Sequence, residues 1–213
     1  MSSASRSRVE NNQMQNSCLK SKNSGGCPEP EISKNATLLK LITNYIKIGR
    51  PRLKGRLAAF KNLPFEVALE KAALAKEISE HDHRFVHLHR LKVSALKEGS
   101  RKILKQKPAL LRCKQFDEVY KIVSDVVDAI TGIGPMYAYD VALRIAANRR
   151  LKPKTVYLQR GVRIGAENLL GRKVGEQALK KSVFPAVLWR LSPMEIEDFL
   201  CIYKGHLKRI KRK

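Results

Sequence analysis

"DAITGIGPMYAYDVALRI", residues 128–145, ends one helical pattern and starts another. The preceding residues, 116–130, carry valines and isoleucines along one broad apolar stripe, with charged residues recurring at helical spacing. Gly132-Ile133-Gly134 interrupts this pattern, because glycine readily adopts positive φ. Pro135 then suits the first turn of a new helix, where its missing amide would lack a partner in any case. We therefore predict a tight αα-hairpin at this point of the chain.

The predicted turn places unpaired backbone amides at the surface. The amides around Gly134, Met136 and Tyr137 would point outward at the positive end of a helix dipole, which is an arrangement that binds phosphate. Ile133 is expected to turn inward as an anchor between the two helices. Ala138 is small enough to let those helices approach closely.

These residues resemble the helix-hairpin-helix motif of DNA-binding and DNA-repair proteins, in which a G-apolar-G turn joins two helices. The resemblance covers roughly forty residues, so it rests on a short motif. It implies that the hairpin backbone holds a DNA phosphate, often together with a monovalent cation. The residues that would form this site are Gly132, Ile133, Gly134, Met136 and Tyr137. The alternative is an ordinary tight helical turn with a C-cap glycine.

The rest of the chain predicts an all-α fold, a multi-helix domain over residues 35–213 that contains the helix-hairpin-helix motif. Residues 1–34 are rich in Ser, Asn, Gly and charge, so we expect a disordered N-terminal extension. Helical periodicity starts near Leu38 and is expected to stop at Gly49, with residues 49–56 as a basic linker. Further helices are expected at 63–79, 86–104 and 116–130, Pro153 starts another element over 154–170, and a last helix is expected at 192–209.

The start of the last helix has the clearest signal. Ser192 and Glu195 have the spacing of a capping box, and Pro193 stands at the first helical position. Glu197 and Asp198 follow in the same segment, where acids are favourable near the positive end of the helix dipole. We therefore interpret the three acids as partners of the helix start and not as metal ligands.

The charge of the chain indicates a polyanionic partner. Lys and Arg number 43 and Asp and Glu number 19, which gives a net charge of +24. No apolar run is long enough to cross a membrane, and the first residues carry no apolar signal region, so we expect a cytoplasmic protein that binds no membrane.

The predicted partner is therefore nucleic acid. Duplex DNA bound without strong sequence preference is the first choice, because the hairpin would contact backbone phosphates, and an RNA- or ribosome-associated protein is the alternative. Further phosphate contacts are expected from Arg50 and Arg52 in the basic linker and from Lys208 and Arg209 in the C-terminal tail.

An enzyme is the other alternative. The helix-hairpin-helix DNA glycosylases are similar in layout, and in that family a catalytic Asp follows the hairpin and many members add a catalytic Lys. In this sequence Tyr157 or Leu158 stands at the place of the Asp, and Pro135 or Met136 at that of the Lys. Base excision needs those groups, so we expect binding without catalysis and assign no catalytic residue. A glycosylase- or lyase-type enzyme with displaced groups, such as Asp140, remains the alternative.

Two other motifs have competing interpretations. The segment 81–90, HDHRFVHLHR, places His83 and His87 on one helix face, as metal ligands can be, but it lacks a third ligand at known spacing. We expect the histidines from His81 to His89 to cap a helix and to add donors to a basic surface, with no metal and no other cofactor. Residues 48–56, IGRPRLKGR, resemble an AT-hook of the minor groove, although a basic linker is the simpler interpretation.

Overall fold

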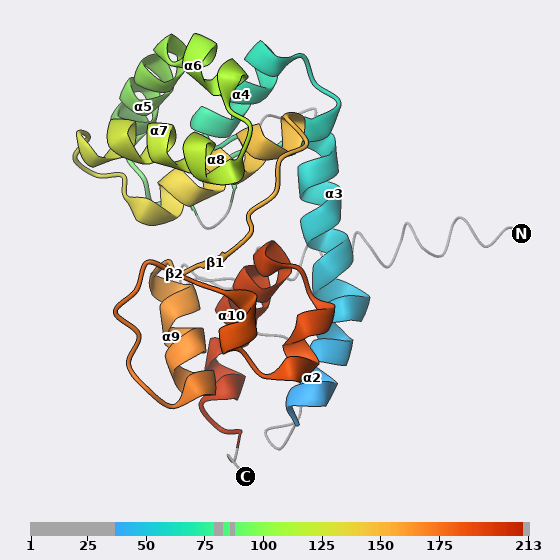
Figure 1. The fold of residues 1–213 in the computed structure, drawn as a ribbon. Helices are drawn as coiled ribbons and strands as arrows, with labels where there is room; N and C mark the ends of the chain where they lie inside the picture. Colours follow the sequence, from blue (N-terminus) through green and yellow to red (C-terminus); the bar gives the residue numbers. More distant parts are fainter. Residues whose placement is uncertain (1–36, 79–82, 86–87, 211–213) are drawn as a thin grey trace, which may run out of the picture.

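The computed structural model describes residues 37–78, 83–85 and 88–210, and this part of the chain has the predicted all-α fold (Figure 1). The α-helices are α2 (Leu38–Asn44), α3 (Arg50–Lys61), α4 (Phe65–Ala73), α5 (Val93–Lys105), α6 (Lys107–Arg112), α7 (Phe116–Asp128), α8 (Pro135–Asn148), α9 (Arg160–Leu170) and α10 (Pro193–Leu207). The short elements are the π-helix η1 (Tyr45–Gly49), the 3-10 helices η3 (Lys181–Val183) and η4 (Ala186–Arg190), and the antiparallel strands β1 (Val156–Tyr157) and β2 (Ala178–Leu179). The predicted extension, 1–34, lies outside the described residues.

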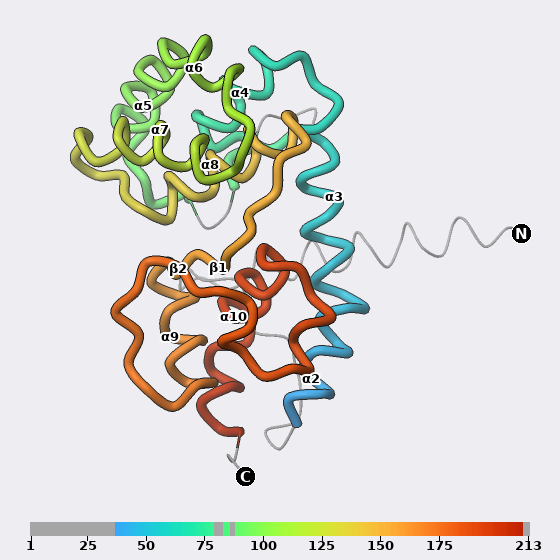
Figure 2. The backbone as a smooth tube through the Cα atoms, viewed as in Figure 1, coloured from blue at the N-terminus to red at the C-terminus, as the bar shows by residue number. Residues whose placement is uncertain are grey.

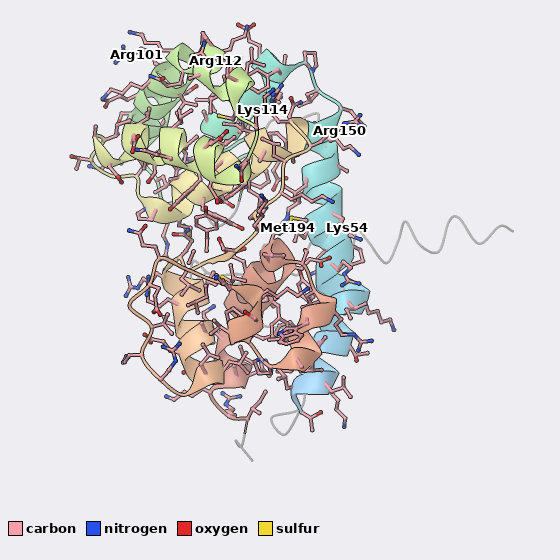
Figure 3. All side chains as sticks on the ribbon, viewed as in Figure 1. Lys54, Arg101, Arg112, Lys114, Arg150 and Met194 are labelled. Atoms are coloured by element: carbon pink, nitrogen blue, oxygen red, sulfur yellow. The ribbon has the colours of Figure 1, made fainter. Side chains whose placement is uncertain are left out.

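The described residues form two lobes, which lie one above the other in Figures 1 and 2. The upper lobe contains α4 to α8, the lower lobe contains α2, α9, α10 and the two strands, and α3 runs beside both. Each lobe has its own cluster of buried hydrophobic side chains, one including Phe116 and Tyr139 and the other including Tyr45 and Phe199. Met194 at the start of α10 lies between the lobes in Figure 3 and packs against the upper cluster.

Residues 49–56 are helical, so the predicted basic linker is wrong. The helical path continues from α2 through η1 into α3 without a break. Gly49 does not end the helix; a Cβ at this position would meet the ring of Tyr45, so the glycine allows that ring to pack closely. Leu53 and Phe60 are buried on α3. Their packing outweighs the low helix propensity of the glycines in this segment.

The helices on either side of the glycine turn pack against each other. α7 begins with a capping box in which Glu118 accepts a hydrogen bond from the backbone of Gln115. Val119, Val123 and Val127 form its buried stripe. Ala138 on α8 is fully buried, as expected for a position where two helices approach closely.

The lower lobe is built on the contact between α9 and α10. Ser192 and Glu195 form the predicted capping box, with Ser192 Oγ donating to Glu195 Oε2 at 2.9 Å. Gly165 on α9 lies against the backbone of α10, and a Cβ at Gly165 would stand 2.8 Å from the carbonyl carbon of Leu200. The close contact between the two helices therefore requires glycine at this position.

Within the part of the chain that the structure describes, no helix combines the length and the apolar composition that crossing a membrane requires.

Candidate functional site

The turn between α7 and α8 contains two glycines with different backbone requirements. Gly132 has a φ of +96°, a region that L residues rarely adopt, so the backbone itself requires glycine there. Gly134 is extended, with φ −157° and ψ −166°, and other residues adopt this conformation readily. A Cβ added at Gly134 would meet nothing within 4 Å. The surface at Gly134 is therefore open to approach from outside.

The side chains on either side of Gly134 point to different environments. Ile133 packs against the upper hydrophobic cluster, as predicted for an anchor. Tyr137 is buried, and its hydroxyl donates to the carbonyl of Ala73 at 2.5 Å. Burial raises the pKa of this hydroxyl above its ordinary value, and Arg144 opposes the rise. The whole Tyr137 residue, backbone included, is thus only 1% exposed, whereas Met136 is 45% exposed.

The start of α8 presents unpaired amides. Gly134 is the N-cap residue and has no side chain that could accept from them, and Pro135 has no amide. The first hydrogen bond at this end runs from the Ala138 amide to the Gly134 carbonyl. Among the described residues, the amides of Met136 and Tyr137 have no backbone acceptor. They stand at the positive end of a fourteen-residue helix.

A cavity of about 290 Å³ adjoins this helix start. It is lined by Leu91, Gly134, Pro135, Met136, Tyr137, Gln159 and Arg160. Three of the five predicted hairpin residues, Gly134, Met136 and Tyr137, therefore lie on one surface. That surface also includes Gln159 and Arg160 at the start of α9, which were not predicted.

The predicted basic contacts are not gathered around the turn. Arg50 and Arg52 belong to α3, which lies on the opposite side of the upper lobe from the turn (Figure 1). Lys208 and Arg209 are exposed just beyond α10, at the end of the lower lobe farthest from the upper lobe. Other basic side chains are also spread out, with Arg101 at the top of the upper lobe and Lys54 and Arg150 beside α3 (Figure 3).

Arg50 also has a partner within the protein. Its Nε atom lies 2.7 Å from Glu195 Oε1, and its Nη2 donates to the carbonyl of Arg190 at 3.1 Å. The same Glu195 carboxylate accepts from the backbone and hydroxyl of Ser192. Burial alone would raise the pKa of Glu195, but the Ser192 hydrogen bonds and the Arg50 charge bring it below its ordinary value. Arg50 thus connects α3 to the start of α10.

The positions compared with the catalytic Asp are buried and apolar or aromatic. Tyr157 packs among Phe116, Tyr120 and Tyr139, and its hydroxyl donates to Asp117 Oδ1 at 2.6 Å. Leu158 is part of the lower hydrophobic cluster. Met136 and Pro135, compared with the catalytic Lys, line the cavity without adding a charge to it.

Two of the remaining acids, Asp140 and Asp198, form ion pairs. Asp140 Oδ2 lies 3.3 Å from Arg144 Nη2. Asp198 accepts from the Tyr45 hydroxyl at 3.0 Å and pairs with Arg56 at 3.5 Å, so it is more than a partner of the helix dipole. Burial raises the pKa of the half-buried Glu197 well above its usual value, Asp198 and Asp140 add to the rise, and Arg56 opposes it.

The histidine segment is only partly described. His81 and His87 lie outside the described residues, whereas His83 is exposed and His89 Nε2 lies 2.6 Å from the Arg84 carbonyl. The expected helix start at residue 86 is also not observed, since α5 begins at Val93. No group of three His, Cys, Asp or Glu side chains arranged to hold a metal occurs among the residues that the structure describes.

Comparison of this chain with protein-family models, with curated proteins and with solved structures gives no match.

Gln159 and Arg160 could not have been singled out from the sequence. They follow Gly134 by 25 and 26 positions along the chain and reach it only because β1 leads the chain back to the lobe boundary. The sequence pattern indicated one continuous element over residues 154–170, and this is wrong, because the chain forms the strand β1 at Val156–Tyr157 and begins α9 only at Arg160.

Proposed function

We propose that this protein binds nucleic acid, with duplex DNA as the preferred form, and that the turn at residues 132–137 contacts the phosphate backbone. The observation that carries the proposal is the open start of α8. Its amides at Met136 and Tyr137 have no side-chain cap, and a Cβ added at the N-cap residue Gly134 would meet nothing within 4 Å. Helix starts of this kind bind phosphate, and the net charge of +24 supports a polyanionic partner.

The proposed binding is largely independent of base sequence and non-catalytic. Backbone phosphates position a protein on DNA without specifying bases. Tyr157 and Leu158, at the place of a catalytic Asp, are buried and carry no carboxylate. The monovalent cation implied by the resemblance, and the cytoplasmic location expected from the sequence, belong to the same proposal.

The proposal is tested by comparing two glycines that both have open space around them. Gly134→Val adds a branched side chain in front of the α8 amides, while Gly175→Val adds the same side chain to an exposed loop of the lower lobe. Binding to a fluorescent duplex is measured by anisotropy, and helix content by circular dichroism. We expect Gly134→Val to bind about tenfold more weakly, because a charge-assisted hydrogen bond to phosphate is lost.

Each part of the proposal has its own contradicting result. If Gly134→Val and Gly175→Val bind the duplex equally well, the turn is not the contact surface. If the wild-type protein prefers an RNA duplex of equal length, RNA replaces DNA as the partner. Release of bases from uracil- or 8-oxoguanine-containing duplexes by the pure protein would show an enzyme instead.

A further inference from the structure

The cavity beside the turn lies where two helices from different lobes begin. α8 belongs to the upper lobe and α9 to the lower lobe, and the first residues of both line the cavity. Neither helix has a side chain that caps its amides. Each helix start carries a partial positive charge, so two such starts around one cavity favour an anion more strongly than one does.

The side chain of Gln159 also points to a ligand. Gln159 is only 7% exposed, lines the cavity, and occupies the N-cap position of α9 without capping it. Within the described residues, its side-chain amide has no hydrogen-bond partner. This amide is not one of the fully buried side-chain groups that lack a partner, so it meets solvent in the cavity, where a hydrogen-bond acceptor that fits can replace water as its partner.

The charges around the cavity are of one sign. Arg160 lines it, and no ion pair of its guanidinium is found in the part of the chain that the structure describes. Arg90 and Lys92, on either side of the lining residue Leu91, are exposed. None of the lining residues is acidic. The lining is mostly apolar, so an anion in the cavity would meet one lining cation, Arg160, and the Gln159 amide, without a repelling carboxylate among the lining residues.

We propose that this cavity binds a phosphate group between the starts of α8 and α9, with the Gln159 amide and the Arg160 guanidinium as its side-chain ligands. Arg160 provides a planar fork of donors, and the backbone amides of both helix starts provide the rest. The inference extends the proposed function and rests on it for the α8 amides. It adds α9, Gln159 and Arg160, so that a bound phosphate would connect the two lobes.

The first experiment uses inorganic phosphate as the probe. Full-length protein labelled with ¹⁵N is titrated with phosphate against chloride at equal ionic strength, and the amide signals of Met136, Tyr137 and Gly161 are followed. We expect all three signals to shift together. Arg160→Gln and Gln159→Leu should each weaken phosphate binding by about tenfold, as expected for the loss of a hydrogen bond to an anion.

The matched control is Arg101→Gln. Arg101 is an exposed arginine at the top of the upper lobe, on the far side from α9 (Figure 3). The Arg101→Gln variant should bind phosphate as well as the wild-type protein does. If Arg160→Gln and Gln159→Leu both remain folded by circular dichroism and bind phosphate like the control, the inferred site is wrong.

A second experiment separates the sources of the phosphate and the two proposals. Duplexes with and without a 5′-phosphate are compared on wild type, Arg160→Gln and Gly134→Val. A preference for the 5′-phosphorylated duplex that Arg160→Gln abolishes identifies a terminal phosphate, and equal weakening on both duplexes identifies a backbone phosphate. Duplex binding that depends on Gly134 but not on Arg160 or Gln159 overturns this inference and leaves the proposed function standing. Phosphate binding that depends on Arg160, without any duplex binding, overturns the proposed function and leaves this inference standing.

Discussion

The guanidinium of Arg144 lies over the ring of Phe85, with 3.8 Å between its central carbon and the ring centroid. Arg144 is 6% exposed, and burial lowers the pKa of its guanidinium while Asp140 opposes that shift. A buried cation of this kind is stabilised by the ring face and by the carboxylate together. The arrangement gives Asp140 a structural role on α8.

Replacement of Asp140 by Asn should therefore lower stability. The change removes the negative charge beside the buried Arg144, and we expect a loss of about 1–3 kcal/mol in the free energy of unfolding. Asp125→Asn is the matched control, since Asp125 pairs with Lys121 at 2.8 Å on an exposed helix face. It should change stability by less than about 0.5 kcal/mol. Urea denaturation measures the free energy of unfolding of both variants. Equal losses for Asp140→Asn and Asp125→Asn would contradict the structural role of Asp140.

Substitutions at Gly55 test whether α3 is a helix in solution. Gly55 is exposed in α3, and a Cβ there would meet nothing within 4 Å. Gly55→Ala should stabilise the protein by about 0.5–1 kcal/mol, and Gly55→Pro should destabilise it by about 3 kcal/mol, because proline breaks a helix interior. Thermal denaturation followed by circular dichroism compares them. Equal tolerance of both substitutions would restore the linker interpretation of residues 49–56.

Gly165→Ala should weaken the contact between α9 and α10. The added Cβ would stand 2.8 Å from the Leu200 carbonyl carbon, so the helices must move apart, and we expect a loss of about 1–3 kcal/mol. Gly161→Ala, one turn earlier on the same helix, meets only the Cys201 sulfur, at 3.1 Å. Gly161→Ala should lower the free energy of unfolding by a smaller amount, which chemical denaturation of both variants measures. If the two variants unfold at the same denaturant concentration, the close helix contact is not present.

The pH dependence of stability should include a contribution from Glu195. Its pKa is lowered in the folded state, so the stabilisation is fully present above the unfolded pKa of about 4.3 and is lost as the pH falls through the folded value. Glu195→Gln should be less stable than wild type at neutral pH, and the difference should shrink in acid. Urea denaturation between neutral pH and pH 3 measures this difference for Glu195→Gln and for the exposed control Glu176→Gln. A constant difference for Glu195→Gln would contradict the role of the carboxylate.

The basic residues beyond α10 should affect the salt dependence of nucleic-acid binding only if the ligand reaches them. The chain end that follows α10 lies far from the turn in Figure 1, so we expect the double substitution Lys208→Gln with Arg209→Gln to matter on long duplexes. There the log–log salt slope should become shallower by about two units, or about 0.9 for each lost phosphate contact. Base preference should not change. An unchanged slope on a long duplex would mean that these side chains do not contact nucleic acid.

Local signals in the sequence predicted the parts of the fold that depend on neighbours in the chain. The capping box of Ser192 and Glu195, and the helices on both sides of Gly132, follow from residue types at short spacing. The helical state of residues 49–56 could not be predicted in this way. It depends on Leu53 and Phe60 being buried by distant segments. The two glycines and the proline of this segment have low helix propensity, so the local sequence indicated a linker.

The sequence predicted only the residues of the candidate site that lie next to one another in the chain. Gly134, Met136 and Tyr137 follow from the turn motif, whereas Gln159 and Arg160 join them through tertiary structure. Arg50 illustrates the same limit, because its charge indicated a surface contact and only the fold brings it to Glu195. A count of basic residues does not distinguish the arginines that hold two helices together from those that meet a ligand.

The two lobes differ in the order in which their contacts can form. Helices α4 to α8 follow one another in the chain, so the upper lobe closes mainly short loops. The lower lobe joins residues far apart in sequence; Asn44 donates to the Tyr203 hydroxyl at 2.9 Å across 159 positions. Long loop closures cost more entropy and slow folding. The upper lobe should therefore acquire protected amides first during refolding, and α2 should stay without its partner until α10 arrives.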